Sequence, residues 1–176
     1  TMIRSCAVVQ KSIPDIQYLI YGDDKAVPEY TDTCLHLIEE LGIKENFRFM
    51  GPRSDSHNIF PEGDLSILTS ISEGFPFTVI ESMSCGVPVV STDVGGVKEA
   101  LDENSGFLCK PKNAQEIGHR VIELLQNHEL RSKMATHARQ RVLDHFTISK
   151  FIRQYEDVYE QLLNEHQVEN QPVETF

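Results

Sequence analysis

The stretch that decides the fold runs Ser70-Ile-Ser-Glu-Gly-Phe-Pro-Phe-Thr-Val-Ile-Glu-Ser-Met-Ser-Cys-Gly-Val-Pro-Val-Val90. It holds two carboxylates, Glu73 and Glu81, with seven residues between them. A Gly-Phe-Pro turn follows Glu73, and the pattern beyond it predicts a helix that starts at Pro76. A Gly-x-Pro break then leads into an apolar strand. A turn, a helix and a strand in this order are typical of an α/β protein.

The start of this helix has the features of a phosphate site. Pro76 suits the first helical position, because its φ is already helical and its missing N–H costs nothing there. The next two amides, Phe77 and Thr78, are then unpaired donors at the positive end of the helix dipole, and such amides attract phosphate. Gly74, just before them, lets the backbone approach a ligand closely.

The two carboxylates suit hydroxyl groups. A carboxylate accepts hydrogen bonds from two hydroxyls at once, so it matches the vicinal diols of a sugar or a ribose. Glu73 is expected at the end of the preceding strand and Glu81 about one turn into the helix. An acidic residue early in a surface helix is also common without any ligand, because it complements the dipole. The whole pattern favours a site for a polyhydroxyl ligand that carries a phosphate.

Strands and helices are expected to alternate along most of the chain. The expected strands are 16–21, 47–50, 64–69, 88–92 and 106–109, and the expected helices are 2–12, 31–41, the helix from 76, 97–101, 114–126, 129–144 and 149–163. This alternation predicts an α/β, Rossmann-like, doubly wound parallel sheet with extra C-terminal helices. Ligands collect at the carboxyl ends of such strands. Gly22, Gly51, Glu73 and Gly95 each follow an expected strand, so one crevice is expected to contain them.

The composition describes one soluble globular domain. The chain has 176 residues, 40% hydrophobic and 24% charged, which is enough for a substantial core. Its formal net charge of −11 disfavours a nucleic-acid partner and direct binding to an anionic membrane. Membrane association is therefore expected only through parts outside this chain, and no apolar run is long enough to span a bilayer.

Metal and redox chemistry are not expected. Cys6, Cys34, Cys85 and Cys109 form no C-x-x-C pair and are expected to be reduced core thiols in a cytosolic protein, without a metal site. The chain has no Asp-x-Asp motif. The basic residues at 131, 133, 139 and 141 are expected to form a solvated helix face.

The 70–90 stretch resembles the E-x7-E signature of retaining glycosyltransferases with the two-domain GT-B architecture, the glycosyl transferase group 1 family. The matching residues are Ser70, Glu73, Gly74, Phe75, Glu81, Met83, Gly86, Pro88, Val89 and Val90. Shorter resemblances follow in family order: Tyr21-Gly22 to a glycine-rich loop, Phe49-Met50-Gly51 to a Phe-x-Gly motif whose following loop frames the nucleotide base, 92–99 to a Gly-Gly-x-x-Glu loop, and 106–108 to a Gly-x-Leu strand.

This resemblance implies a domain and a set of partners. Residues 1–164 are expected to form the C-terminal, donor-binding half of a GT-B fold, lacking its first strand and its basic Gly-Arg-x-x-x-x-Lys motif, with 165–176 a flexible polar tail. The implied partners are a nucleotide-sugar donor and the N-terminal acceptor domain of the same enzyme. The implied location is cytoplasmic, with the parent enzyme peripheral at the inner face of the membrane.

The resemblance also implies roles for individual residues. Glu73 is implied to hold the donor sugar and to be the catalytic residue, and Glu81 to hold the ribose. The implied donor-binding residues are Gly22, Met50, Gly51, Arg53, Glu73, Gly74, Phe75, Pro76, Phe77, Thr78 and Glu81. Arg53 is expected to reach either a phosphate or the base.

The implied activity is transfer of a hexose from a nucleotide diphosphate sugar to a glycan or lipid-linked acceptor, without cofactor or metal. The chain alone is expected to bind the donor weakly and not to catalyse transfer. Similarity to bacterial exopolysaccharide glycosyltransferases favours a UDP-sugar. Two other functions stay open: a sugar-nucleotide epimerase with the same fold, and a non-catalytic nucleotide- or partner-binding module.

Overall fold

The computed structural model describes residues 1–169, which alternate between helices and strands as expected. In order, the elements are α1 (Met2–Gln10), β1 (Tyr18–Tyr21), α2 (Pro28–Glu40), η1 (Lys44–Asn46), β2 (Phe47–Gly51), α3 (Ser56–Ile59), η2 (Phe60–Glu62), β3 (Ser66–Leu68), α4 (Phe77–Ser84), β4 (Val89–Thr92), α5 (Val97–Ala100), β5 (Gly106–Cys109), α6 (Ala114–Gln126), α7 (His128–His145) and α8 (Ile148–Glu169). Each expected strand and helix is present within a few residues of its predicted bounds.

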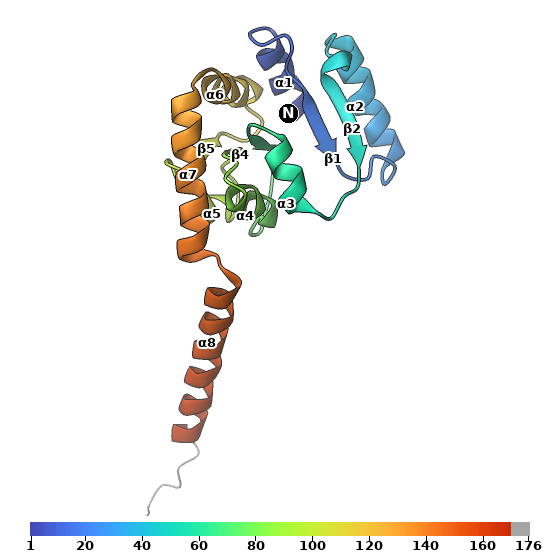
Figure 1. Ribbon diagram of the computed structural model, residues 1–176. Helices are drawn as coiled ribbons and strands as arrows, with labels where there is room; N and C mark the ends of the chain where they lie inside the picture. The colour runs from blue at the N-terminus through green and yellow to red at the C-terminus, as the bar shows by residue number, and fades with distance from the viewer. Residues whose placement is uncertain (170–176) are drawn as a thin grey trace, which may run out of the picture.

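All strand pairs are parallel, which confirms that part of the prediction. The five strands form two hydrogen-bonded groups, β1–β2 and β3–β4–β5, and not one continuous sheet. Figure 1 shows β1, β2 and α2 together on one side of the molecule, and α4, α5, α6 and α7 around the second group. The strands β1 and β3 are the edges of their groups, and residues of both line the same cavity.

The core lies where α1 and α6 pack together over the strands. Ile117, Val121 and Leu124 of α6 recur at helical spacing and are buried. Gly118 lets the two helices approach closely, because a Cβ at this position would lie 2.8 Å from Cβ of Val8 in α1. Asn113 caps α6 with its side-chain oxygen, which accepts from the Glu116 amide at 3.2 Å.

A second buried cluster joins α4 and α7 to β4. Val79 and Met83 of α4 are buried against it. Ser82, on the same helix, is also buried, and its polar atom is satisfied: its hydroxyl donates to Val87 O at 3.0 Å and lies 2.7 Å from the hydroxyl of Ser66 in β3. These contacts fix α4 against the ends of β3 and β4, which is the part of the fold that matters for the site.

Several predicted boundaries were wrong by a few residues. Pro76 is the N-cap of α4 and not its first residue, because its ψ of 105° is extended and its carbonyl accepts the first helical bond, from Val79 N–H. The helix expected at 31–41 begins at Pro28. The short helix Ser56–Ile59 was not predicted. The domain end expected at 164 stays a prediction; the helix α8 continues to Glu169, and 170–176 lie outside the described residues.

The helix α8 leads away from the rest of the molecule (Figure 1). Its side chains are exposed from Ile148 through Glu165. The apolar positions predicted for this helix are therefore present at helical spacing but face solvent, with Phe151, Tyr155 and Tyr159 each more than half exposed. Within residues 1–169, no helix combines the length and apolarity needed to cross a membrane.

Candidate functional site

The loop before α4 is held in place by the loop after β4. The Thr92 hydroxyl donates to Ser70 O at 2.6 Å, and the Gly96 amide donates to Gly74 O at 2.8 Å. Gly95 has a φ of +52°, and a Cβ there would lie only 1.8 Å from Glu73 O. Only glycine fits both the dihedral and the space at Gly95. The close approach of Gly95 and the hydrogen bond from Gly96 thus fix the backbone at Glu73 and Gly74.

Glu73 is a half-buried carboxylate at the end of this loop. The Ser70 hydroxyl donates to its Oε1 at 2.6 Å. One carboxylate oxygen is thereby oriented by a neighbour three residues earlier, and further hydrogen bonds remain available to hydroxyl groups of a ligand. This explains the Ser-x-x-Glu spacing in the sequence in structural terms.

The N-terminus of α4 presents free amides. Across residues 1–169, the amides of Phe77 and Thr78 donate no hydrogen bond to another residue. The Phe77 side chain is 72% exposed, while Phe75 packs against Phe146 with ring centroids 5.7 Å apart. Two unpaired donors at the positive end of a helix dipole suit an anionic group.

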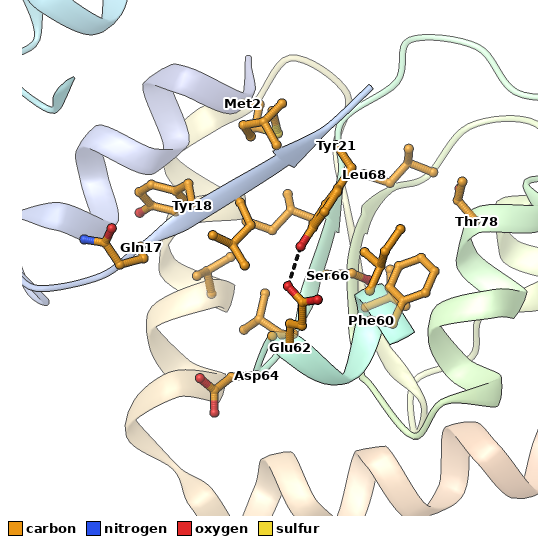
Figure 2. Close-up of a pocket in the computed structure, with 18 of the residues that line it drawn as sticks. Met2, Gln17, Tyr18, Tyr21, Phe60, Glu62, Asp64, Ser66, Leu68 and Thr78 are labelled. Carbon is orange, nitrogen blue, oxygen red and sulfur yellow. Dashed lines mark hydrogen bonds between the residues drawn. The ribbon is translucent and has the colours of Figure 1, made fainter. Parts of the chain in front are cut away.

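A cavity of about 1030 Å³ lies between β1 and β3 and opens beside α4. Of the predicted site residues, Gly22, Arg53, Thr78 and Glu81 line it. Thr78 and Glu81 come from α4, Gly22 follows β1, and Arg53 follows β2, so residues from three separate parts of the sequence meet at one cavity. Figure 2 shows Thr78 at the edge of this cavity, across from Tyr21 of β1.

The remaining predicted residues do not line this cavity. They are Met50, Gly51, Glu73, Gly74, Phe75, Pro76 and Phe77. Of Gly22, Gly51, Glu73 and Gly95, which were expected to share one crevice, Gly22 lines this cavity and the other three do not, and the shared crevice stays a prediction. Gly51 joins the loop after β1 to the loop after β2, because its carbonyl accepts from the Gly22 amide at 3.1 Å.

Arg53 is engaged by two carboxylates. Its Nε and Nη2 donate to the two oxygens of Asp55 at 2.8 and 2.6 Å, and its Nη1 donates to Glu62 Oε1 at 3.0 Å. The guanidinium carbon also lies 5.7 Å from the ring centroid of Tyr21. Figure 2 shows the Tyr21 hydroxyl and the Glu62 carboxylate pointing toward each other, and this hydrogen bond measures 2.6 Å.

The charge states in this cluster follow from the same bonds. Hydrogen bonds from Tyr21 and then from Arg53 lower the pKa of Glu62, and hydrogen bonds from Arg53 hold the pKa of Asp55 well below its usual range. The hydrogen bond to Glu62 raises the pKa of Tyr21. At neutral pH both carboxyl groups are charged and the phenol is neutral. Tyr21, Asp55 and Glu62 were not predicted as site residues, because nothing in their local sequence links them to Arg53.

The basic residues of α7 do not form the solvated face that was expected. Arg131 donates to Leu124 O and Leu125 O, both at 3.0 Å, at the end of α6. Arg139 donates to Ser84 O at the end of α4. These arginines satisfy the last carbonyls of neighbouring helices, where positive charge is favourable. Of the four, Lys133 and Arg139 are exposed, and Arg131 and Arg141 are half-buried.

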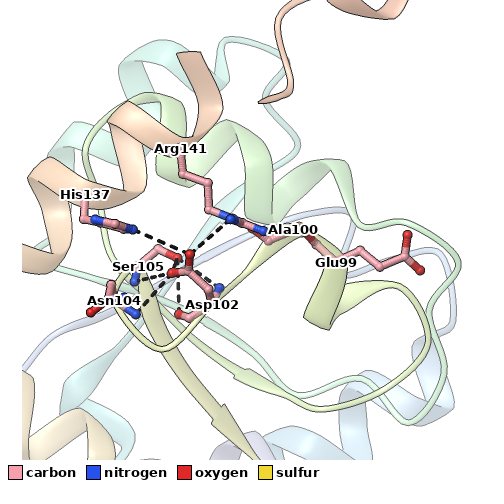
Figure 3. Close-up of polar contacts among 7 residues, drawn as sticks. All are labelled: Glu99, Ala100, Asp102, Asn104, Ser105, His137 and Arg141. Atoms are coloured by element: carbon pink, nitrogen blue, oxygen red, sulfur yellow. Dashed lines mark hydrogen bonds and ion pairs between the residues drawn. The ribbon is translucent and has the colours of Figure 1, made fainter. Parts of the chain in front are cut away.

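Arg141 belongs to a polar cluster that ties α7 to the segment between α5 and β5 (Figure 3). It donates to Ala100 O at 2.7 Å and to Glu99 O at 2.9 Å, and pairs with Asp102 at 3.1 Å. Partial burial raises the pKa of Asp102, but hydrogen bonds from Ser105 and the charge of Arg141 outweigh it, so the net pKa is lowered. None of these residues lines the cavity, which indicates a structural role.

Comparisons with known proteins identify the family. Residues 1–141 match the family model described as glycosyl transferases group 1. The chain belongs to this family. Among curated relatives of this glycosyltransferase domain, it is 32% identical over 152 residues to N-acetyl-alpha-D-glucosaminyl L-malate synthase of Bacillus anthracis, covering 86% of this chain and 39% of the relative. It is 33% identical over 161 residues to trehalose synthase of Pyrococcus horikoshii, covering 88% and 38%.

Solved structures confirm the fold of the glycosyltransferase domain. Anabaena Alr3699/HepE, solved in complex with UDP, aligns with a TM-score of 0.86 at 24% identity over 91% of this chain and 44% of that one. The C-terminal domain of the group 1 glycosyl transferase LpcC from Francisella tularensis aligns with a TM-score of 0.73 at 27% identity, covering 83% and 77%. The predicted Rossmann-like half of a GT-B fold is thus confirmed. The chain spans about 40% of the length of the curated relatives it matches.

Proposed function

We propose that this chain is the nucleotide-sugar donor domain of a retaining hexosyltransferase. The observation that carries the proposal is the convergence of Gly22, Arg53, Thr78 and Glu81 on one cavity, beside the free amides of α4. This convergence supports a site in which an anion-binding helix end, a carboxylate suited to a diol and two strand ends contact one elongated ligand. A nucleoside diphosphate sugar offers a phosphate group and two sets of hydroxyls for these parts.

The site divides the ligand among its residues. Glu73 accepts hydrogen bonds from the sugar, the Phe77 and Thr78 amides bind phosphate, and Glu81 accepts from the ribose hydroxyls. As the bond between sugar and diphosphate breaks, negative charge builds on the leaving group. Preorganised amides stabilise such charge, and the loss of one such donor in comparable sites costs about 2.7–4 kcal/mol. In this scheme no metal is needed, and the basic residues that balance the diphosphate come from outside this chain.

We also propose that a strand from the part of the parent protein before Thr1 lies between β1 and β3. Both edges face the same cavity, whose lining is apolar at Ile16, Ile67 and Val121. The strand fills this apolar part and leaves the part lined by Arg53, Thr78 and Glu81 to the ligand. In a doubly wound sheet a parallel strand precedes each crossover helix. Similarity to a C-terminal domain of a family member supports a preceding segment.

A UDP-sugar is the favoured donor, because the similar Anabaena structures are described as complexes with UDP and with UDP-glucose. The transferred group is then a hexose, and the acceptor is a glycan or lipid-linked molecule bound by the N-terminal domain. The parent enzyme acts in the cytoplasm, peripheral at the inner face of the membrane. The chain alone binds donor weakly and does not catalyse transfer.

The ribose assignment of Glu81 provides the test. UDP and 2′-deoxy-UDP are titrated into the isotope-labelled chain and followed by NMR, which detects millimolar binding. Loss of a charged hydrogen-bond partner predicts that Glu81→Ala weakens UDP by about tenfold or more. The same change should weaken 2′-deoxy-UDP by a smaller factor, because one of the two ribose hydroxyl contacts is already missing.

Glu40→Ala is the matched control, because Glu40 is an exposed helical glutamate on α2 outside the cavity lining. It should leave the binding of both nucleotides unchanged. Equal binding of UDP by Glu81→Ala and Glu40→Ala would overturn the ribose assignment. If the unchanged chain bound no nucleotide at 10 mM, roughly the weakest affinity that counts as recognition, the donor-domain function would fail.

A further inference from the structure

We propose that Phe146, the C-cap residue of α7, is a positioning residue for the phosphate-binding end of α4, and that it acts through the ring of Phe75. This role rests on the proposed donor function and adds to it a residue that lies far from the 70–90 stretch in sequence. Phe146 does not line the cavity, so it is not placed to touch the ligand itself. It holds the loop from Glu73 to Phe77 in the conformation that presents the free amides.

Three aromatic rings link the end of α7 to the start of α4. The ring centroids of Phe75 and Phe146 lie 5.7 Å apart with the planes tilted by 54°, and Phe77 meets Phe75 edge-on at 6.4 Å. Tilted and edge-to-face pairs at such distances are favourable arrangements of aromatic rings. Phe146 is thereby linked, through one intervening ring, to the residue that carries the first of the two free amides.

The 92–96 loop also contacts Phe75. A Cβ added at Gly96 would lie 3.3 Å from Cδ2 of Phe75, so the ring packs closely on this glycine. The Gly96 amide donates to Gly74 O at 2.8 Å, just before the ring in sequence. The Phe75 side chain is 38% exposed, so its position depends on a few neighbours and not on deep burial. Removing the Phe146 ring takes away one of these neighbours.

Phe146 is itself well fixed. Its amide donates to Val142 O at 2.9 Å, and its side chain packs against the buried cluster that contains Val79 and Val97. The guanidinium carbon of Arg141 lies 5.8 Å from its ring centroid. Arg141 is fixed in turn by two backbone carbonyls at the end of α5 (Figure 3). A loop that packs on so rigid a support is already in place when a ligand arrives, which lowers the ordering cost of binding.

A site made of backbone amides depends on the conformation of the backbone. The N–H groups of Phe77 and Thr78 can bind phosphate only while the N-terminus of α4 is held in position. Pro76 lies between Phe75 and Phe77 in the chain, is buried, and has its φ fixed by its own ring. A displacement of Phe75 is therefore passed on to the Phe77 amide.

Titration of the 176-residue chain with UDP, followed by amide NMR, tests this role. Phe146→Leu keeps an apolar side chain against the buried cluster and removes the ring, so the chain still folds. It is expected to weaken UDP binding by about two- to tenfold, the factor that corresponds to one aromatic pair. In a Phe75→Leu chain the same substitution should cause no further loss, because its effect passes through Phe75.

The backbone dynamics of the ligand-free chain give a second readout. Phe146→Leu should lower the NMR order parameters of the Phe77 and Thr78 amides relative to the unchanged chain. Met134→Ala is the matched control, because it removes a buried apolar side chain of α7 from the other buried cluster, outside the cavity lining. It should lower the Tm but leave the UDP affinity and these two order parameters unchanged.

Three results would overturn the proposed role. The first is a UDP affinity of Phe146→Leu equal to that of Met134→Ala. The second is a loss that multiplies with the loss caused by Phe75→Leu, because Phe146 would then act independently of Phe75. The third is unchanged order parameters at Phe77 and Thr78. In all three cases the unchanged chain still binds UDP and the donor function stands, whereas no UDP binding to the unchanged chain at about 10 mM would overturn both.

Discussion

Replacing Gly95 by alanine should displace the loop that carries Glu73. Gly95 has a φ of +52°, a left-handed conformation that costs an alanine roughly 1–2 kcal/mol. The added Cβ would lie 1.8 Å from Glu73 O, so the 73–74 backbone must move. That movement breaks the 2.8 Å bond from the Gly96 amide to Gly74 O, worth about 1 kcal/mol. Together these terms predict a loss of about 2–3 kcal/mol in unfolding free energy.

Thermal unfolding followed by circular dichroism measures this loss. A domain of this size loses about 2–4 °C in Tm per kcal/mol, so Gly95→Ala should unfold about 4–12 °C lower. Gly74→Ala is the control, because Gly74 is exposed, lacks a left-handed φ and has no atom within 4 Å of an added Cβ. If Gly95→Ala were as stable as Gly74→Ala, the close approach of the two loops would be refuted.

Three further predictions concern charge and burial. Arg141→Met should lower the unfolding free energy by about 1–3 kcal/mol, because three backbone and carboxylate contacts are lost, whereas Lys133→Met should change it little; urea titration distinguishes the two. The pKa of Asp102 is lowered in the folded chain. Its carboxylate therefore stabilises the fold fully above the unfolded pKa of about 3.9, and this stabilisation is lost as the pH falls through the pKa of the folded chain. The Tm difference between the unchanged chain and Asp102→Asn should thus be seen at pH 7 and close at strongly acidic pH, and a gap independent of pH would contradict this. Burial raises the pKa of Cys6 to about 12 and that of Cys109 to about 11, so a thiol reagent at pH 8 should label the half-buried Cys34 and Cys85 and spare Cys6 and Cys109 in the folded chain.

The sequence predicted elements better than it predicted contacts between them. The helix α4 and its neighbours could be recognised because Glu73, Pro76 and Glu81 have fixed spacing, and local chemistry sets that spacing. The separation of the strands into the groups β1–β2 and β3–β4–β5 could not be predicted, because strand pairing depends on distant strands and not on local periodicity.

The sequence also did not predict the interaction partners of the charged residues. Arg53 and Glu62 are nine positions apart and meet only because η2 turns back toward the end of β1. Arg131, Arg139 and Arg141 have the composition of a solvated helix face, yet each satisfies carbonyls of another element. Such contacts depend on the tertiary fold, because the sequence of one helix does not show whether the end of another helix lies beside it.

In the proposed complex, a nucleoside diphosphate binds across the cavity with its phosphates at the α4 amides. The most direct measurement is a two-dimensional amide NMR spectrum of the 176-residue chain, recorded with increasing UDP. We expect the largest shifts at the amides of Phe77 and Thr78, with smaller ones at Gly22 and Arg53. Shifts confined to other surfaces, such as the exposed face of α7, or no shifts at saturating UDP, would contradict it.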